Sequence, residues 1–114
     1  MKRDLSLFLE DILVNINDIE SFVGNLSRER LEINKLRTKA ILRSLEVIGE
    51  AVKHIPSEIR EKYPNIPWKD VAGMRDVLIH AYFGIENDHI WKAIKKDLPI
   101  LKTEVKKILK DLNE

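Results

Sequence analysis

The sequence contains no cysteine and no glutamine, and it has only four glycines and four prolines among 114 residues. Without cysteine, disulfide bridges and thiolate metal sites are excluded. The scarcity of glycine and proline argues against a turn-rich β architecture. The sequence also lacks a run of about 18 apolar residues, so no membrane-spanning helix is predicted. The opening residues, Met1 to Ser6, do not resemble a signal peptide, and we therefore expect a cytoplasmic protein.

The composition is that of one globular domain, covering residues 1–114. Apolar residues make up 44% of the chain and charged residues 34%, with a net charge of only +1. The charge is nevertheless uneven, because seven lysines between Lys92 and Lys110 face only Asp97 and Glu104. Two interpretations are open. These lysines form either a solvated helix face or an electropositive surface that binds a phosphate backbone.

Apolar residues recur at intervals of three and four along most of the chain. This period predicts an all-α protein, an antiparallel bundle of four long helices plus one short helix. The expected helices cover residues 4–23, 27–54, 57–63, 67–84 and 87–112. Gly24 should end the first helix and Ser27 should open the second. Pro99 should kink or break the last helix near Lys95 to Leu98.

The predicted helix over 67–84 carries most of the reactive side chains. Arg75, Asp76, His80 and Tyr82 fall within eight residues. Asp76 and His80 are four residues apart, so the carboxylate can hold one ring nitrogen and leave the other for chemistry. Arg75 and Tyr82 are nearly eclipsed, about 10 Å apart along the helix axis. Arg75 and His80 are expected to flank a shared groove.

This helix is apolar on two sides, which predicts a subunit interface. One arc packs on the rest of the domain and contains Val71, Met74, Val77, Leu78 and Ala81. The other arc places Trp68, Ile79 and Phe83 among the polar side chains. A small domain has few layers to cover a second apolar face, so we expect a homodimer in which these three residues meet their partner. Such a dimer would bring two arginines and two histidines into one composite site.

The three histidines, His54, His80 and His89, lack metal-ligand spacing, so neither a metal site nor a cofactor is expected. Arg75 beside Asp76 fits a plain ion pair, and His80 fits a structural histidine. The same residues also fit metal-free cleavage of RNA. A histidine can take the ribose 2′-hydroxyl proton, and an arginine can hold the negative charge that develops on the phosphate.

The string Gly-Met-Arg75-Asp76-x3-His80-x-Tyr82 resembles the signature of the HEPN superfamily, specifically the HepT-like toxins of toxin–antitoxin pairs. Further matching strings are Ile48-Gly49-Glu50-Ala51, Ile66-Pro67-Trp68 and Ile90-Trp91. The resemblance extends over essentially the whole chain.

The resemblance implies an all-α homodimer that acts as a metal-independent ribonuclease toxin. Arg75 and His80 of both subunits would be catalytic, with Asp76 in support. The implied partner is a nucleotidyltransferase antitoxin of the MntA type, as in type VII pairs. It would transfer AMP from ATP to Tyr82 and so neutralise the toxin.

Two other functions are open for the same residues. One is a non-catalytic module whose cleft binds a nucleotide or docks a minimal nucleotidyltransferase. The other is a plain structural dimer, which is disfavoured because burying Arg75, Asp76 and His80 among apolar side chains costs several kcal/mol unless each is paired. The sequence does not separate the ribonuclease from the non-catalytic module.

Overall fold

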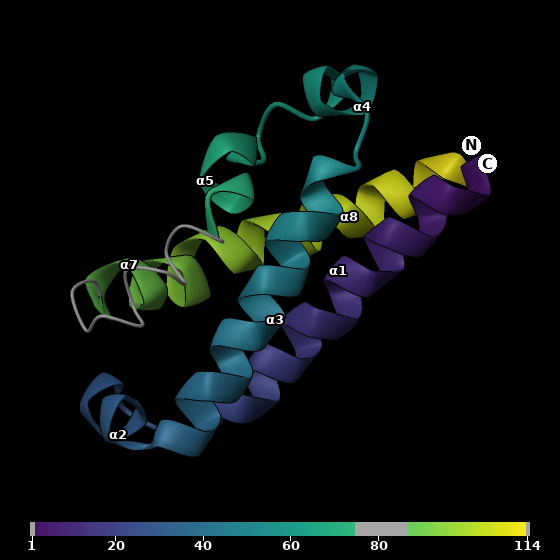
Figure 1. Ribbon diagram of the computed structural model, residues 1–114. Coiled ribbons are helices and arrows are strands. Elements are labelled where there is room, and N and C mark those ends of the chain that lie inside the picture. Colours follow the sequence, from purple (N-terminus) through teal and green to yellow (C-terminus); the bar gives the residue numbers. More distant parts are fainter. Residues whose placement is uncertain (1, 75–86, 114) are drawn as a thin grey trace.

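The computed structural model describes residues 2–74 and 87–113, and these residues are helical with no strand among them (Figure 1). The expectation of an all-α protein is confirmed. The elements in chain order are α1 (Lys2–Val23), α2 (Arg28–Ile33), α3 (Lys35–Lys53), α4 (Ser57–Lys62), α5 (Trp68–Ala72), α7 (Asn87–Lys92), the π-helical turn η1 (Ala93–Asp97) and α8 (Leu98–Leu112). Within this part of the chain, no helix is both long and apolar enough to cross a membrane.

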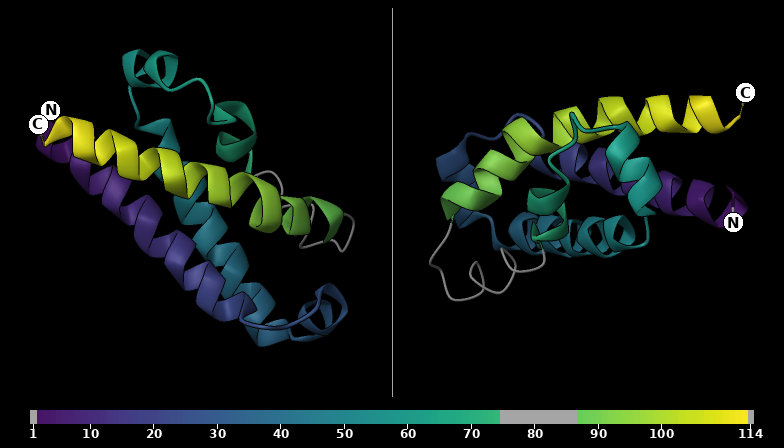
Figure 2. Two further views of the ribbon diagram at one scale, coloured as in Figure 1. Left: turned by 180° about the vertical axis from the view of Figure 1, so that it is seen from behind. Right: turned by 90° about the horizontal axis from the view of Figure 1, so that it is seen from above.

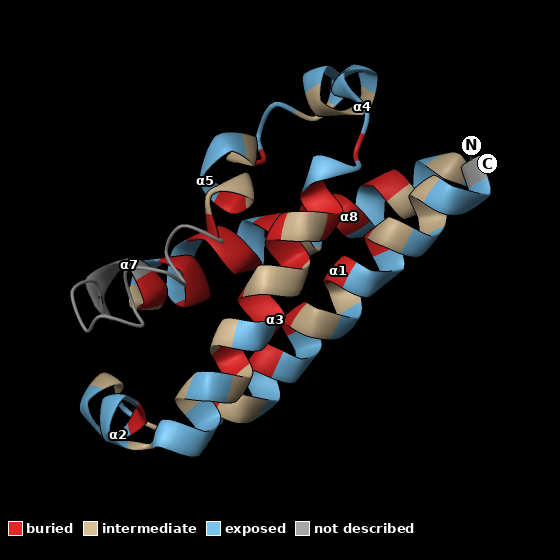
Figure 3. Ribbon diagram, viewed as in Figure 1, coloured by how far each residue is buried: buried red, intermediate tan, exposed pale blue. Residues whose placement is uncertain are grey.

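Three long helices form the body of the molecule. α1 packs against both α3 and α8, and it runs antiparallel to each of them (Figures 1 and 2). The end of α8 lies beside the start of α1. Buried residues recur along all three helices (Figure 3). The largest fully buried side chains include Leu9, Ile12, Ile16, Ile19, Ile41, Leu45, Ile48, Met74, Leu101 and Ile108.

The turn after α1 follows the expectation from sequence. Gly24 adopts φ +53°, a left-handed conformation that glycine adopts without steric cost. The hydroxyl of Ser27 then accepts a hydrogen bond of 3.3 Å from the backbone N–H of Arg30, which caps the start of α2.

The single helix expected over 27–54 is wrong, because the chain breaks at Asn34 into α2 and α3. The side chain of Asn34 accepts a 3.1 Å hydrogen bond from the N–H of Arg37 and caps α3. The Thr38 hydroxyl donates across the break to the carbonyl of Leu31. The break buries Leu31, but it leaves Ile33 and Leu36 exposed at 80% and 82%.

The last helical run is irregular where Pro99 predicted an irregularity. The α-helix gives way to η1 over Ala93–Asp97, and the N–H of Leu98 donates to the carbonyl of Ala93, five residues earlier. Pro99, which lacks an N–H, then occupies the first turn of α8, where a backbone donor is not needed. The π turn therefore accommodates the proline without ending the helical run.

Candidate functional site

The reactive residues of the motif lie outside the described part of the chain. These are Arg75, Asp76, His80 and Tyr82, together with the expected interface residues Ile79 and Phe83. The structure describes the elements that precede and follow this segment in the chain. α5 leads into the segment from one side, and α7 and η1 follow it on the other. Both α5 and α7 contact η1.

The helix predicted over 67–84 is interrupted at Gly73. α5 ends at Ala72, Met74 is helical again, and residues 75–84 of the predicted helix lie outside the described residues. The N–H of Gly73 donates to the carbonyl of Lys69, and an added Cβ would meet that carbonyl oxygen at 3.2 Å. Glycine therefore permits the tight end of α5. Val71 and Met74 are buried, as expected for the arc that packs on the domain.

Trp68 fixes the start of α5. Its ring is half-buried against the core of its own chain, and its indole N–H donates to the carbonyls of Arg60 and Tyr63 at 3.1 and 3.0 Å. Sequence reasoning placed Trp68 at a subunit interface and missed these bonds. The subunit interface remains a prediction. Within the chain, the indole of Trp68 joins the start of α5 to the segment that contains Arg60 and Tyr63.

Arg60 anchors the same corner to α3. Its guanidinium donates to the carbonyls of Val52 and Ile55, at 2.8 and 3.0 Å, and so satisfies acceptors at the end of that helix. Tyr63 joins the corner to α8 through a hydrogen bond from its hydroxyl to the carboxylate of Asp111. This bond, with burial, raises the pKa of Tyr63 to about 12. Together these contacts hold the Ile66-Pro67-Trp68 string in place.

Exposed lysines lie on α7 and η1, the elements that follow the motif segment. Lys92, Lys95 and Lys96 are all exposed on α7 and η1. The ammonium of Lys95 lies 4.9 Å from the centre of the Trp91 ring, within the range of a cation–π contact. Trp91 itself is partly buried against the core.

Asp97 is a buried carboxylate that sequence reasoning counted as a surface charge. It is only 7% exposed. Burial raises its pKa, Asp70 adds to that effect, and the positive charges of Lys92 and Lys96 oppose it. The signal was present in the sequence, because Asp97 lies three residues after Ile94 and four before Leu101, inside the apolar stripe. Glu104 is buried on the same stripe, and its carboxylate lies 3.4 Å from the ammonium of Lys107.

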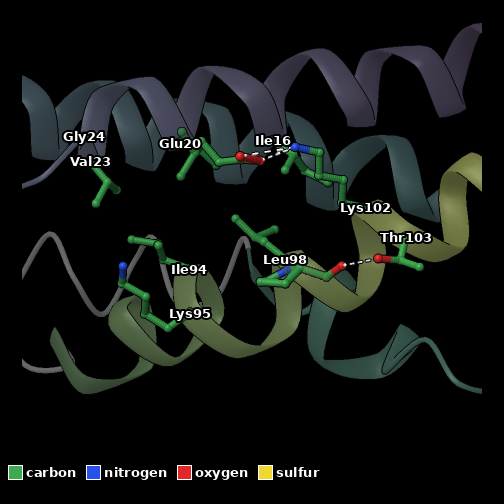
Figure 4. A pocket seen from close by; sticks show the side chains of 11 residues that line it. Ile16, Glu20, Val23, Gly24, Ile94, Lys95, Leu98, Lys102 and Thr103 are labelled. Carbon is green, nitrogen blue, oxygen red and sulfur yellow. Dashed lines mark hydrogen bonds and ion pairs between the residues drawn. The ribbon is translucent and has the colours of Figure 1, made fainter.

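A hollow of about 540 Å³ lies between the end of α1 and the η1–α8 junction (Figure 4). Its floor is apolar and includes Ile16, Ile19, Val23, Ile94 and Leu98. Two of its polar edge groups are engaged with protein partners: Lys102 pairs with Glu20 at 2.6 Å, and the Thr103 hydroxyl donates to the carbonyl of Pro99. Lys95 also lines the hollow, and its ammonium lies 4.9 Å from the centre of the Trp91 ring.

The histidines in the described residues do not form a metal site. Across residues 2–74 and 87–113, no group of three or more histidine or carboxylate side chains is placed to hold an ion. His54 caps the end of α3, and its ring stacks on Phe8 with centroids 4.5 Å apart. His54 therefore lies at a helix end with its ring packed on α1.

Comparison with known proteins identifies the family. A family model described as ribonuclease HepT-like matches residues 12–108. "Putative RNase MJ0125" of Methanocaldococcus jannaschii is 51% identical over 113 residues, which cover 99% of this chain and 97% of the relative. "Probable ribonuclease HepT" of Thermococcus cleftensis is 44% identical over 110 residues, 96% of this chain and 100% of the relative. No solved structure matches the chain.

The fold and these matches define a class, the all-α domains of ribonuclease type. The chain belongs to the ribonuclease HepT-like family. The resemblance drawn from the motif strings is therefore confirmed.

Proposed function

We propose that this protein is a metal-independent endoribonuclease and the toxin of a type VII toxin–antitoxin pair. The observation that carries the proposal is the family match over residues 12–108, which spans the complete Arg75-x4-His80-x-Tyr82 string. Relatives that match nearly the whole chain carry ribonuclease names.

The proposed reaction is internal transesterification. His80 takes the proton of a ribose 2′-hydroxyl, and the resulting alkoxide attacks the adjacent phosphorus. Arg75 stabilises the negative charge of the transition state, since its guanidinium is always protonated. The bond to the 5′-oxygen of the next nucleotide breaks and that oxygen is protonated. The products are a 2′,3′-cyclic phosphate and a 5′-hydroxyl. Asp76 orients His80 through one ring nitrogen.

The active cleft is proposed to be shared by two subunits. Each subunit contributes Arg75 and His80, and the contact surface includes Trp68, Ile79 and Phe83. The support is the two-sided apolar pattern of the motif segment. The buried positions of Val71 and Met74 support the inner side of that pattern.

Neutralisation is proposed to occur on Tyr82. A nucleotidyltransferase antitoxin of the MntA type transfers AMP from ATP to the tyrosine hydroxyl and releases pyrophosphate. Arg75 and Tyr82 are seven residues apart, a spacing that places them on one face of a helix. An attached AMP would therefore add bulk and negative charge beside the arginine.

The decisive experiment is RNA cleavage by the purified protein in EDTA, with His80→Ala as the comparison. Intact mass first establishes that Tyr82 carries no adduct. We expect cyclic-phosphate ends from the native protein and a loss of at least 100-fold in rate for His80→Ala, the scale of a general base. The control variant is His54→Ala, since His54 is exposed at the end of α3 and should leave cleavage unchanged.

Absence of cleavage by the unmodified protein would reject the ribonuclease proposal. The non-catalytic module, with the cleft binding a nucleotide or docking a nucleotidyltransferase, would then be the better explanation. Equal cleavage by the native protein and His80→Ala would instead reject His80 as the base.

A further inference from the structure

Three lysines lie within five residues of one another on α7 and η1 and are here named the lysine ridge: Lys92, Lys95 and Lys96. All three are exposed. The ridge begins six residues after the end of the 75–86 segment, which carries Arg75 and His80. Lys95 and Lys96 follow Lys92 by three and four residues, a spacing at which side chains lie within about one turn of each other along a helix.

The ridge differs from other basic side chains in the described chain, many of which are engaged by protein groups. Lys102 pairs with Glu20 at 2.6 Å, and Lys107 lies 3.4 Å from Glu104. Arg60 is bound to backbone carbonyls. The carboxylate nearest the ridge in sequence, Asp97, is buried; burial raises its pKa, whereas the positive charges of Lys92 and Lys96 lower it, so Asp97 opposes at most one of the three ridge charges. The ridge therefore retains much of its positive charge for an external anion.

Trp91 gives one ridge lysine a defined position. The Lys95 ammonium lies 4.9 Å from the centre of the indole ring, and Trp91 is itself held by contact with the core. A lysine side chain normally loses substantial rotamer freedom when it binds a ligand. The indole already restrains Lys95 in the free protein, so Lys95 loses less conformational entropy when it binds a ligand.

We propose that the lysine ridge, on the elements that follow the cleavage motif in the chain, holds the sugar–phosphate backbone of single-stranded RNA, with Trp91 as the positioning residue for Lys95. This inference rests on the ribonuclease function proposed above. Lysine binds phosphate as a compact point charge and does not require a particular base. The ridge thus contributes affinity and alignment of the strand rather than sequence selection.

The test measures binding of a single-stranded RNA 12-mer in which every 2′-hydroxyl is methylated. This RNA lacks the attacking nucleophile and stays intact whether or not the protein is catalytic. The dissociation constant is measured over a series of salt concentrations. For single strands, each neutralised phosphate contributes about −0.7 to the slope of log affinity against log salt. Replacing Lys92, Lys95 and Lys96 by glutamine should therefore reduce the slope by about 2 and weaken binding at low salt at least tenfold.

The matched control removes three lysines elsewhere. Lys62, Lys106 and Lys110 are exposed on α4 and the distal part of α8. Their replacement by glutamine changes the net charge equally, and it should leave the slope nearly unchanged. Equal losses in the two triple variants would overturn the proposal, because binding would then follow net charge alone. A native protein that does not bind this RNA would overturn it as well.

Trp91→Leu separates positioning from charge. It should weaken RNA binding several-fold while the salt slope stays that of the native protein, because no charge is removed. Circular dichroism establishes that the variant is folded. A folded Trp91→Leu variant with native affinity would reject the positioning role. A loss of RNA binding on the ridge substitutions, combined with a native protein that fails to cleave unmodified RNA, would reject the proposed reaction. That result would support the lysine ridge as an RNA-binding surface.

Discussion

Asp97 occupies an interior position of the last helical run, where an apolar residue would suit the packing. Burial raises the pKa of its carboxyl above the ordinary value of 3.8, despite the opposing charges of Lys92 and Lys96. The folded state therefore favours the protonated form. Between pH 3.8 and the raised folded pKa, the native protein binds more protons than the unfolded chain, and its stability falls as pH rises.

Replacing Asp97 by asparagine removes this pH-dependent loss. We expect Asp97→Asn to have a larger free energy of unfolding than the native protein at pH 7, measured by urea denaturation. The difference should shrink as the pH approaches 3.8, the ordinary pKa of an aspartate carboxyl. Asp11→Asn, at an exposed position of α1, is the control and should show little change. A less stable Asp97→Asn at pH 7 would mean that the ionised carboxylate is a net stabilising group.

At the residue scale, local signals predicted local features well. Gly24 and Ser27 have the conformation and the capping bond that their residue types favour. The bonds of Trp68 to the carbonyls of Arg60 and Tyr63 were not predictable, because they depend on how the chain folds back after α4. The motif residues were recognised from their spacing and from the resemblance. Their arrangement remains a prediction.

Asn34 separates α2 from α3, although the spacing of apolar residues over 27–54 predicts one continuous helix. In a continuous helix, Arg30, Asn34 and Arg37 would continue the stripe that contains Ile41, and these polar residues would face the core. The break avoids this and turns Leu31 inward instead. An expectation based on helical spacing alone missed the break, because asparagine is tolerated within helices and the capping bond to Arg37 is visible only in the fold.

Asn34→Ala tests the division of these elements. Loss of the cap should lower the free energy of unfolding by about 1 kcal/mol, measured by urea denaturation. Helix content by circular dichroism should not fall, because alanine favours continuation of the helix through the break. Asn25→Ala, at an exposed position of the preceding turn, is the matched control. An equal loss of stability in both variants would show that the cap is not the cause.

The extent of α5 has a similar explanation. Pro67 predicted a helix start, and α5 begins at the next residue. The end at Ala72 was not predicted, because Gly73 within an apolar period is compatible with a continuing helix as well as with a helix end. A Cβ at position 73 would meet the carbonyl oxygen of Lys69 at 3.2 Å, a contact that the spacing of residues in the sequence does not reveal.

At the scale of the whole molecule, the proposed dimer gives a direct prediction. Ile79→Lys places a charge in the expected interface and should convert the dimer to monomers, measured by sedimentation velocity. Leu7→Lys is the control, since Leu7 is 52% exposed on the outer side of α1 and should leave the dimer unchanged. An unchanged dimer for Ile79→Lys would remove Ile79 from the interface.

The double role of α1 has a consequence for the order of folding. α1 packs on α3 and also on α8, which is synthesised after α1, α3 and the motif segment. The α1–α3 pair is available early, but the side of α1 that receives α8 stays uncovered until translation has passed residue 112. A nascent chain stalled before that point would carry the motif segment without the helix that completes its core. We therefore expect a nascent chain stalled before α8 to lack the packing that α8 gives to α1 and to be less stable than a chain that contains α8.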